Sequence, residues 1–158
     1  MKRLLSRSDL SGLKETLAHS NKTKIVSTNG CFDILHVGHV RILEAAKKLG
    51  DVLVVGINSD DSVKRLNKGP ERPINTALNR AEILLALACV DYVTIFDEDT
   101  PSAFLKELKP DIHVKGSDYK PEDLEETPVV EAGGGRVHIL DLIPGFSTTS
   151  TVEKLQKS

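Results

Sequence analysis

The chain has 158 residues, enough for one domain with a single sizeable core and short for two. Hydrophobic residues make up 39% and charged residues 28%, with 21 basic against 23 acidic side chains and a formal net charge of -2. This balance argues against a nucleic-acid-binding surface, which normally carries a clustered basic excess. No apolar run approaches the roughly 20 residues that span a bilayer, and the N-terminus lacks the apolar stretch of a secretory signal.

The two cysteines, Cys31 and Cys89, cannot form a disulfide framework. Free thiols without an export signal are typical of a reducing compartment, so we expect a cytoplasmic protein with neither nucleic-acid nor membrane partners. For Cys89 simple packing as a small apolar residue is the favoured interpretation.

Helices and strands are predicted to alternate along the chain. Leu10, Leu13 and Leu17 recur at helical spacing and predict a leader helix over residues 8–19, within an N-terminal leader of residues 1–22. In chain order there follow a strand at 24–28, a helix at 38–49, a strand at 51–58, a short helix at 60–66, a helix at 77–88, a strand at 91–96, a helix at 101–108, strands at 111–116 and 136–141, and a closing helix at 147–156.

Local signals support several of these boundaries. Gly50 is an expected C-terminal cap, Asp60 and Thr76 are expected N-terminal caps, and Pro101 suits a first helical turn. The alternation predicts a single α/β domain over residues 1–158, with core 24–155. Its fold would be a Rossmann-like open, mostly parallel five-stranded sheet with helices on both faces. Ligands of such sheets lie beyond the C-terminal strand ends, where the strand order reverses.

The stretch NGCFDILHVGHV joins the first strand to the first long helix. A helix N-terminus offers unpaired backbone N–H groups and the positive end of a dipole, which favour an anion. Gly30 allows a tight turn there, and Gly38 lets a phosphate approach the helix backbone. His36 and His39 would face the same space, where each can donate an N–H to a phosphate oxygen.

Two other interpretations of this stretch are weaker. Zinc needs three or four converging ligands, and no third histidine or second cysteine lies at useful spacing from His36 and His39, although Cys31 and Asp33 are near. The dinucleotide-binding pattern G-x-G-x-x-G is absent, because Gly30 is followed only by Gly38.

The string HVGH within GCFDILHVGH resembles the H-x-G-H signature of the nucleotidylyltransferase superfamily. The wider sequence resembles the D-glycero-D-manno-heptose 1-phosphate adenylyltransferase group, found in bacteria as a free enzyme or fused to a sugar kinase. Further matches run in order through NSDDSVKRLNKGPERPIN, VKGSDYKPE and GGGRVHILDLIPGFSTTSTV, and together cover nearly all of residues 24–155.

The resemblance implies that His36 and His39 hold the triphosphate of ATP and stabilise charge as the α-phosphorus is attacked. Lys68 is the favoured phosphate-contacting lysine and completes the expected catalytic set. The residues expected to border the nucleotide, mainly through backbone atoms, are Asn29, Gly30, Cys31, Phe32, Asp33 and Gly38.

Further cations are needed where two polyanions meet. Lys64, Arg65 and Arg72 are candidates beside Lys68, although any one of them can equally be a surface charge. Arg80 falls on the first turn of an apolar helix, where it can reach phosphate across the cleft or simply cover the helix surface.

The remaining predicted contacts come from strand ends and helix starts. Lys115, Gly116 and Asp118 follow the fourth strand and could contact phosphate or ribose, whereas Ser147, Thr148 and Thr149 add hydroxyl groups at the start of the closing helix. The expected sugar-phosphate set is Asn58, Asp60, Arg65, Arg72 and Tyr119. A solvated loop position is an equal alternative for Tyr119, and ordinary capping explains one of the three hydroxyls.

One departure from relatives concerns the approach to this helix. Glycerol-phosphate cytidylyltransferases carry an arginine shortly before the Ser-Thr-Thr run, where this chain reads LIPGF. The absence counts against use of CTP and leaves open which cation faces the β- and γ-phosphates. Mg²⁺ is the expected cofactor, with Asp33 the nearest carboxylate and no established protein ligand.

The expected reaction converts ATP and D-glycero-D-manno-heptose 1-phosphate to ADP-heptose and pyrophosphate, for lipopolysaccharide or other surface-sugar assembly. A separate kinase is expected to supply the sugar phosphate, because no kinase-sized region precedes residue 24. A homodimer is possible, as in relatives. The alternatives are a cytidylyltransferase for glycerol 3-phosphate or a related alcohol phosphate, and a nucleotide-binding sensor without turnover.

Overall fold

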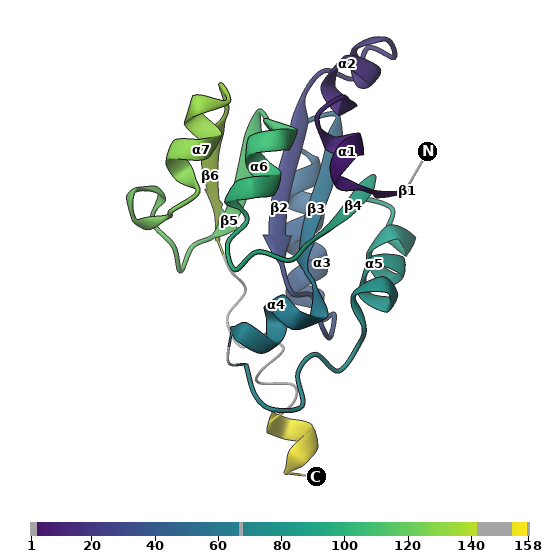
Figure 1. Ribbon diagram of the computed structural model, residues 1–158, viewed down its shortest axis with the longest axis vertical. Coiled ribbons are helices and arrows are strands. Elements are labelled where there is room, and N and C mark those ends of the chain that lie inside the picture. Colours follow the sequence, from purple (N-terminus) through teal and green to yellow (C-terminus); the bar gives the residue numbers. More distant parts are fainter. Residues whose placement is uncertain (1–2, 67, 142–152, 158) are drawn as a thin grey trace.

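Six parallel strands form one sheet in the computed structural model, which describes residues 3–66, 68–141 and 153–157 (Figure 1). The spatial order is β1-β4-β3-β2-β5-β6, and every pairing is parallel. The strands are β1 (Arg3–Leu5), β2 (Ile25–Gly30), β3 (Val52–Asn58), β4 (Tyr92–Phe96), β5 (Ile112–Gly116) and β6 (Arg136–Leu140). The predicted α/β class is confirmed, whereas the count of five strands is wrong by one.

Helices connect these strands at the predicted places. They are α1 (Arg7–Leu10), α2 (Leu13–Ala18), α3 (Val37–Lys47), α4 (Asp60–Arg65), α5 (Ala77–Ala86), α6 (Ser102–Leu108), α7 (Thr127–Ala132) and the 3₁₀ turn η1 (Pro121–Asp123). Both α7 and η1 were missed. Of the predicted closing helix, residues 153–156 are helical, and residues 147–152 lie outside the described part of the chain.

Both faces of the sheet are buried, as a parallel sheet requires. Successive residues of β3 alternate between faces: Val52 and Val54 join one apolar cluster, and Leu53, Val55 and Ile57 join the other. The first cluster includes residues of α1, α2, α6 and α7, and the second includes residues of α3 and α5. This is why β3 reads as an unbroken apolar run rather than as an alternating strand.

The N-terminal leader differs from the single helix that was expected. Residues 3–5 form β1, which pairs with β4 at the sheet edge. The helix is broken into α1 and α2 at Ser11 and Gly12, because glycine is a poor helix former. The three leucines that suggested a helix, Leu10, Leu13 and Leu17, are all buried against the sheet. Their apolar spacing was therefore a sound indicator of burial but not of helix continuity.

The strand order reverses at β2, which lies between β3 on one side and β5 on the other. The register pairs Thr28 with Val114, so the last residues of β2 lie beside those of β5. These C-terminal strand ends and α4 lie at the same end of the molecule (Figure 1). The topology therefore brings the predicted nucleotide residues of the two strands together. No helix among the described residues is long and apolar enough to cross a membrane.

Candidate active site

The turn from β2 into α3 contains a residue in a strained conformation. Phe32 has a φ of 49°, in the left-handed region that residues other than glycine rarely adopt. Gly30 makes room for the Phe32 ring, since a Cβ at Gly30 would lie 2.9 Å from Phe32 Cε2. Backbone strain of this kind is concentrated at ligand sites. The absence of a side chain at Gly30 therefore serves the packing of Phe32 rather than a turn at Gly30 itself.

The two histidines lie together, as predicted. His36 is the N-cap of α3 and His39 is its third residue. Their rings stack with centroids 3.8 Å apart and planes 18° from parallel. The centroid of the Phe32 ring lies 5.2 Å from that of the His39 ring, and the two ring planes are 58° apart, so Phe32 also packs against this imidazole. The first turn of a helix, with its unpaired N–H groups and positive dipole end, adds to the attraction for an anion.

The hydrogen bonding and electrostatics make both rings neutral donors at pH 7. The backbone N–H of His36 donates to His39 Nδ1 at 3.4 Å, so the proton of the neutral ring resides on Nε2. Burial, with repulsion from His36 and the Lys68 ammonium, lowers the pKa of His39 to about 4. Burial also lowers the pKa of His36. An anion placed against the pair would favour their protonated forms and raise these pKa values again.

Lys68 is the exposed cation of this site. Its ammonium forms no ion pair with a carboxylate in residues 3–66, 68–141 or 153–157. It is nevertheless close enough to His39 to lower the pKa of that imidazole. An exposed, unpaired lysine beside two neutral imidazoles is a suitable partner for a polyphosphate.

Arg72 and Asp33, both predicted to lie at the ligand site, form an ion pair with each other. Arg72 Nε donates to Asp33 Oδ2 at 2.5 Å, and the side chains are 4% and 0% exposed. Asp33 also accepts the backbone N–H groups of Ile74 and Asn75 at 2.9 and 2.8 Å. Burial opposes ionisation of Asp33, but these N–H groups and the Arg72 guanidinium hold its pKa below the usual range. The pair joins the loop before α5 to the turn after β2.

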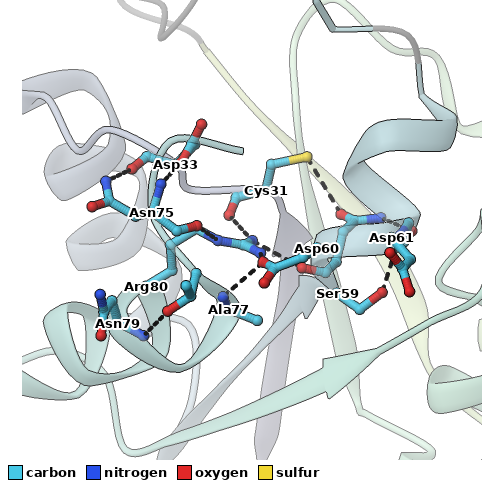
Figure 2. Close-up of polar contacts among 12 residues, drawn as sticks. Cys31, Asp33, Ser59, Asp60, Asp61, Asn75, Ala77, Asn79 and Arg80 are labelled. Carbon is cyan, nitrogen blue, oxygen red and sulfur yellow. Dashed lines mark hydrogen bonds and ion pairs between the residues drawn. The ribbon is translucent and has the colours of Figure 1, made fainter. Parts of the chain in front are cut away.

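Arg80 is also buried, with 0% of its side chain exposed. Its guanidinium donates to the carbonyl oxygens of Asn75, Cys31 and Asn58 at 3.0, 2.7 and 2.8 Å. Figure 2 shows it between these segments and the Asp60 carboxylate, which it contacts at 2.8 Å. Arg80 therefore joins the ends of β2 and β3 to α5, and its expected contact with phosphate stays a prediction.

The other residues predicted from the 58–66 segment have local partners. Asn58 is buried and donates to Ser62 Oγ at 3.0 Å. Ser59, not Asp60, caps α4, because Ser59 Oγ accepts the Ser62 N–H at 3.0 Å. Asp60 accepts from Ala77 N and Arg80 instead.

The two exposed cations of α4 face other carboxylates. Arg65 pairs with Asp99 at 2.7 Å, and Lys64 lies 3.7 Å from Asp61. Both cations are thus engaged in surface ion pairs, and the sugar-phosphate contact expected of Arg65 stays a prediction.

Across the switch point, Lys115 lies at the end of β5. Its ammonium donates to Asn29 Oδ1 at 3.1 Å, lies 3.1 Å from Glu126 Oε1, and stands 4.8 Å from the Tyr119 ring centroid. Gly116 ends β5, and Asp118 follows in an exposed turn. The structure therefore brings together Asn29 and Lys115, which were predicted separately to contact the nucleotide.

Two buried polar residues behind this side were missed. Glu126 is 4% exposed at the start of α7, and His113 is fully buried with Nδ1 2.8 Å from Ser27 Oγ. A lone histidine in a strand and a glutamate in a charged loop carry no sequence signal. In the sequence, the one sign of a polar environment around His113 was Lys115, two residues later in the same strand.

Three predicted residues cannot be placed. Ser147, Thr148 and Thr149 lie outside the described residues, so their expected contact with phosphate stays a prediction.

No group of three or more His, Cys, Asp or Glu side chains among the described residues could hold a metal ion. Both carboxylate oxygens of Asp33 accept hydrogen bonds, from Arg72 and Ile74 on one and from Asn75 on the other. The donor set on this side therefore does not fit a Mg²⁺ ion held by the protein.

Comparison with known families identifies the fold around this site. A model of the cytidylyltransferase-like family matches residues 27–137, from β2 to β6. The chain belongs to the cytidylyltransferase-like family. The matched range contains the stacked histidines, both buried arginines and Lys115, so the geometry above is that of a cytidylyltransferase-like domain.

Several curated proteins resemble this cytidylyltransferase-like chain strongly. The bifunctional protein HldE of Syntrophotalea carbinolica is 52% identical over 149 residues, which are 94% of this chain and 30% of that protein. The HldE protein of Citrifermentans bemidjiense is 54% identical over 89% of this chain and 28% of that protein. The HldE protein of Haemophilus influenzae is 52% identical over 91% of this chain and 30% of that protein. The chain thus spans less than a third of their length. Because these relatives combine two functions in one polypeptide, they give no support to the expected separate kinase.

Two solved structures share the fold. The lipopolysaccharide core biosynthesis protein of Thermoplasma volcanium is 34% identical, with a TM-score of 0.62 over 76% of this chain and 96% of that one. A pantoate-β-alanine ligase of Francisella tularensis has a TM-score of 0.60, and the match covers all of this chain and 80% of the ligase chain. The sequence identity is 12%, so this likeness shows a common architecture alone.

Proposed function

We propose that this chain is an adenylyltransferase that converts ATP and D-glycero-D-manno-heptose 1-phosphate to ADP-heptose and pyrophosphate. The observation that carries the proposal is the stacked pair His36 and His39 on the first turn of α3, in a cytidylyltransferase-like domain. Support for the substrates comes from the H-x-G-H and accompanying motifs, and from identities of 52–54% to HldE proteins.

The reaction needs alignment and charge stabilisation more than proton transfer. The second pKa of a phosphomonoester is about 6, so the sugar phosphate is already mostly dianionic at neutral pH. Its oxygen attacks the α-phosphorus of ATP, the bond from that phosphorus to the β-bridging oxygen breaks, and pyrophosphate leaves in line. Positioned N–H donors and cations dominate the catalysis of such transfers.

Each group in the site has a part in this scheme. The neutral Nε2–H of His39 and the His36 ring donate to triphosphate oxygens, and the Lys68 ammonium neutralises their charge. The backbone of the turn after β2 borders the nucleotide together with Asn29 of β2, and Lys115 and Asp118 face it from the end of β5 and the turn that follows. Tyr119 lines the sugar side, and Arg72 and Arg80 act through the segments that they join.

Mg²⁺ would be supplied together with ATP and would neutralise part of the triphosphate charge. The carboxylates of Asp33 and Asp60 accept hydrogen bonds from N–H groups of the chain, and we therefore assign no protein ligand to the ion.

Pyrophosphate release from a two-by-two panel tests the proposal. ATP and CTP are each combined with D-glycero-D-manno-heptose 1-phosphate and with glycerol 3-phosphate. We expect release only with ATP and the heptose phosphate. Release only with CTP and glycerol 3-phosphate would make the chain a cytidylyltransferase, and calorimetric binding of ATP without release in any combination would make it a sensor.

A further inference from the structure

A buried ion pair links two loops of the site without facing the reacting groups. Arg72 Nε lies 2.5 Å from Asp33 Oδ2, with the side chains 4% and 0% exposed. Charges so deeply buried are retained where each has its partner and additional hydrogen bonds, because loss of one leaves the other uncompensated away from water. The pair therefore behaves as one unit.

Asp33 extends this unit to the backbone of the loop before α5. Its carboxylate accepts the N–H groups of Ile74 and Asn75, and its own carbonyl oxygen accepts Asn75 Nδ2–H at 2.6 Å. Together with the Arg72 side chain, four hydrogen bonds hold residues 72–75 against the turn after β2. Figure 2 shows Asn75 against Asp33 at this junction.

The same loop carries Lys68. The backbone N–H of Arg72 donates to the Gly69 carbonyl at 3.2 Å and closes a turn directly after Lys68. Gly69 has a φ of 119°, a conformation that residues with side chains rarely adopt, so this turn is specified locally. Arg72 thus fixes the end of the turn through its backbone and anchors it to Asp33 through its side chain.

We propose that Arg72 is a positioning residue that, through Asp33, sets the exposed Lys68 ammonium beside the stacked pair His36 and His39. The identity of the bound anion as the triphosphate of ATP rests on the proposed function. The placement of Lys68 by Arg72 does not, because it follows from contacts within the chain.

An arginine is required for this role because of its geometry. The guanidinium is planar and directs Nε–H along a fixed line, whereas a lysine ammonium is a point charge on a flexible stem. Arg72→Lys therefore keeps the charge beside Asp33 but loses the fixed direction of the bond, which makes it a mild and specific variant.

A double-mutant cycle with Lys68→Ala measures the coupling. We expect Lys68→Ala to lower kcat/KM for ATP by about 10²-fold, the low end for losing one preorganised donor. Arg72→Lys alone should lower kcat/KM for ATP by about tenfold. In the Lys68→Ala background the same substitution should lower kcat/KM by less than about twofold, because the effects of coupled residues are not additive. The same cost in both backgrounds would overturn the proposal, since a merely structural role would act in both.

A second measurement needs no turnover. An NMR titration follows the His39 imidazole, whose pKa is lowered to about 4. Burial is the largest cause, and repulsion from His36 and from the Lys68 ammonium adds to it. We expect Arg72→Lys and Lys68→Ala to raise this pKa by similar amounts. An unchanged His39 pKa in folded Arg72→Lys would also overturn the proposal. If the titration behaves as expected but the substrate panel yields no pyrophosphate, the proposed function fails and the positioning role stands.

Two further variants complete the design. Arg7→Lys is the matched control, because Arg7 Nε also pairs with a carboxylate, Glu107, at 3.0 Å, but on the surface of α1. We expect it to change neither readout. If Arg72→Lys does not fold, Asn75→Ala removes the side-chain bond to the Asp33 carbonyl within the same junction, and a wild-type His39 pKa in that variant would contradict the proposal.

Discussion

The two loops that meet at the strand switch are built differently. The turn after β2 is tied to neighbouring segments by buried side chains, with Asp33 and Arg80 both fully enclosed. The turn after β5 is exposed from residue 117 to residue 120, and Tyr119 is 47% exposed. Lys115, at the end of β5, connects the two sides through its hydrogen bond to Asn29 Oδ1.

This difference matches the tasks that we assign to the two loops. The side near the histidines must hold charged phosphate groups in one geometry, and preorganised donors are worth most when they need not rearrange. The side after β5 would hold a sugar, whose hydroxyl groups are recognised by adaptable contacts. The comparison predicts that substitutions on the first side reduce turnover, whereas those on the second alter substrate affinity.

The largest effect is expected from the stacked histidines. His36→Ala or His39→Ala should each lower kcat by about 10²–10³, the range for loss of one preorganised donor in the transition state. Steady-state kinetics measure this, and an unchanged melting temperature shows that the fold is intact. Near-normal rates in both variants would remove the histidines from the mechanism.

A smaller effect is expected from the packing that supports them. In Gly30→Ala the new Cβ meets the Phe32 ring at 2.9 Å and displaces it from His39. We expect kcat to fall by about tenfold, since small displacements of catalytic groups are costly. Gly12→Ala is the control, because nothing lies within 4 Å of its added Cβ and Gly12 has a helical backbone. Equal rates in the two variants would argue against a role for Phe32 in holding His39.

On the exposed side, Tyr119→Ala removes the ring over the Lys115 ammonium. An exposed cation–π contact is worth about 0.5–1 kcal/mol, so KM for the sugar phosphate should rise about two- to fivefold with kcat unchanged. Tyr119→Phe keeps the ring and separates that contact from any bond of the hydroxyl. A drop in kcat in the alanine variant would erase the contrast between the two loops.

The smallest effect on activity is expected behind β5, where His113 supports the strand. Burial, with the nearby Lys115 ammonium, lowers the pKa of His113 to about 3. The unfolded chain binds this proton below a pH of about 6.5, so stability from the neutral ring is present above that pH and is lost as the pH falls toward 3.

Urea unfolding at pH 7, 5 and 4 tests this linkage. In His113→Gln the free energy of unfolding should fall less steeply as the pH is lowered. Its kcat at pH 7 should change by less than about twofold. The exposed His19, replaced in the same way, is the control. If the free energy of unfolding of His113→Gln falls as steeply with decreasing pH as that of the unmodified chain, the loss of stability in acid belongs to other groups.

The sequence predicted the framework well, for physical reasons. Apolar runs such as 52–58 must be covered on both faces, and Thr76 caps α5 as expected, with Asn79 N donating to Thr76 Oγ1 at 3.3 Å. The missed elements are short: β1 has three residues and α7 has six, too few for a periodic signal. Gly12 broke a helix that the leucine spacing alone predicted as continuous.

The site was predicted by residue type more reliably than by role. His36 and His39 follow from their position at a helix start, which the local sequence determines. The buried partners of Arg72 and Arg80, Asp33 and Asp60, were not predicted, because a charge in a sequence does not reveal its partner. Asp33 was an expected ligand neighbour for the same reason, since its four hydrogen bonds come from a loop distant in the sequence.

Under the proposed function, the neutral state of the stacked imidazoles bears on how pyrophosphate departs. Pyrophosphate would be held very tightly by a pocket lined with permanent positive charges, and its escape would then limit turnover. Here both buried guanidinium groups are engaged with internal oxygens, and the two rings are uncharged when no anion is present. In the proposed reaction the attraction for the departing anion would therefore weaken at the two rings, while the Lys68 ammonium keeps its charge.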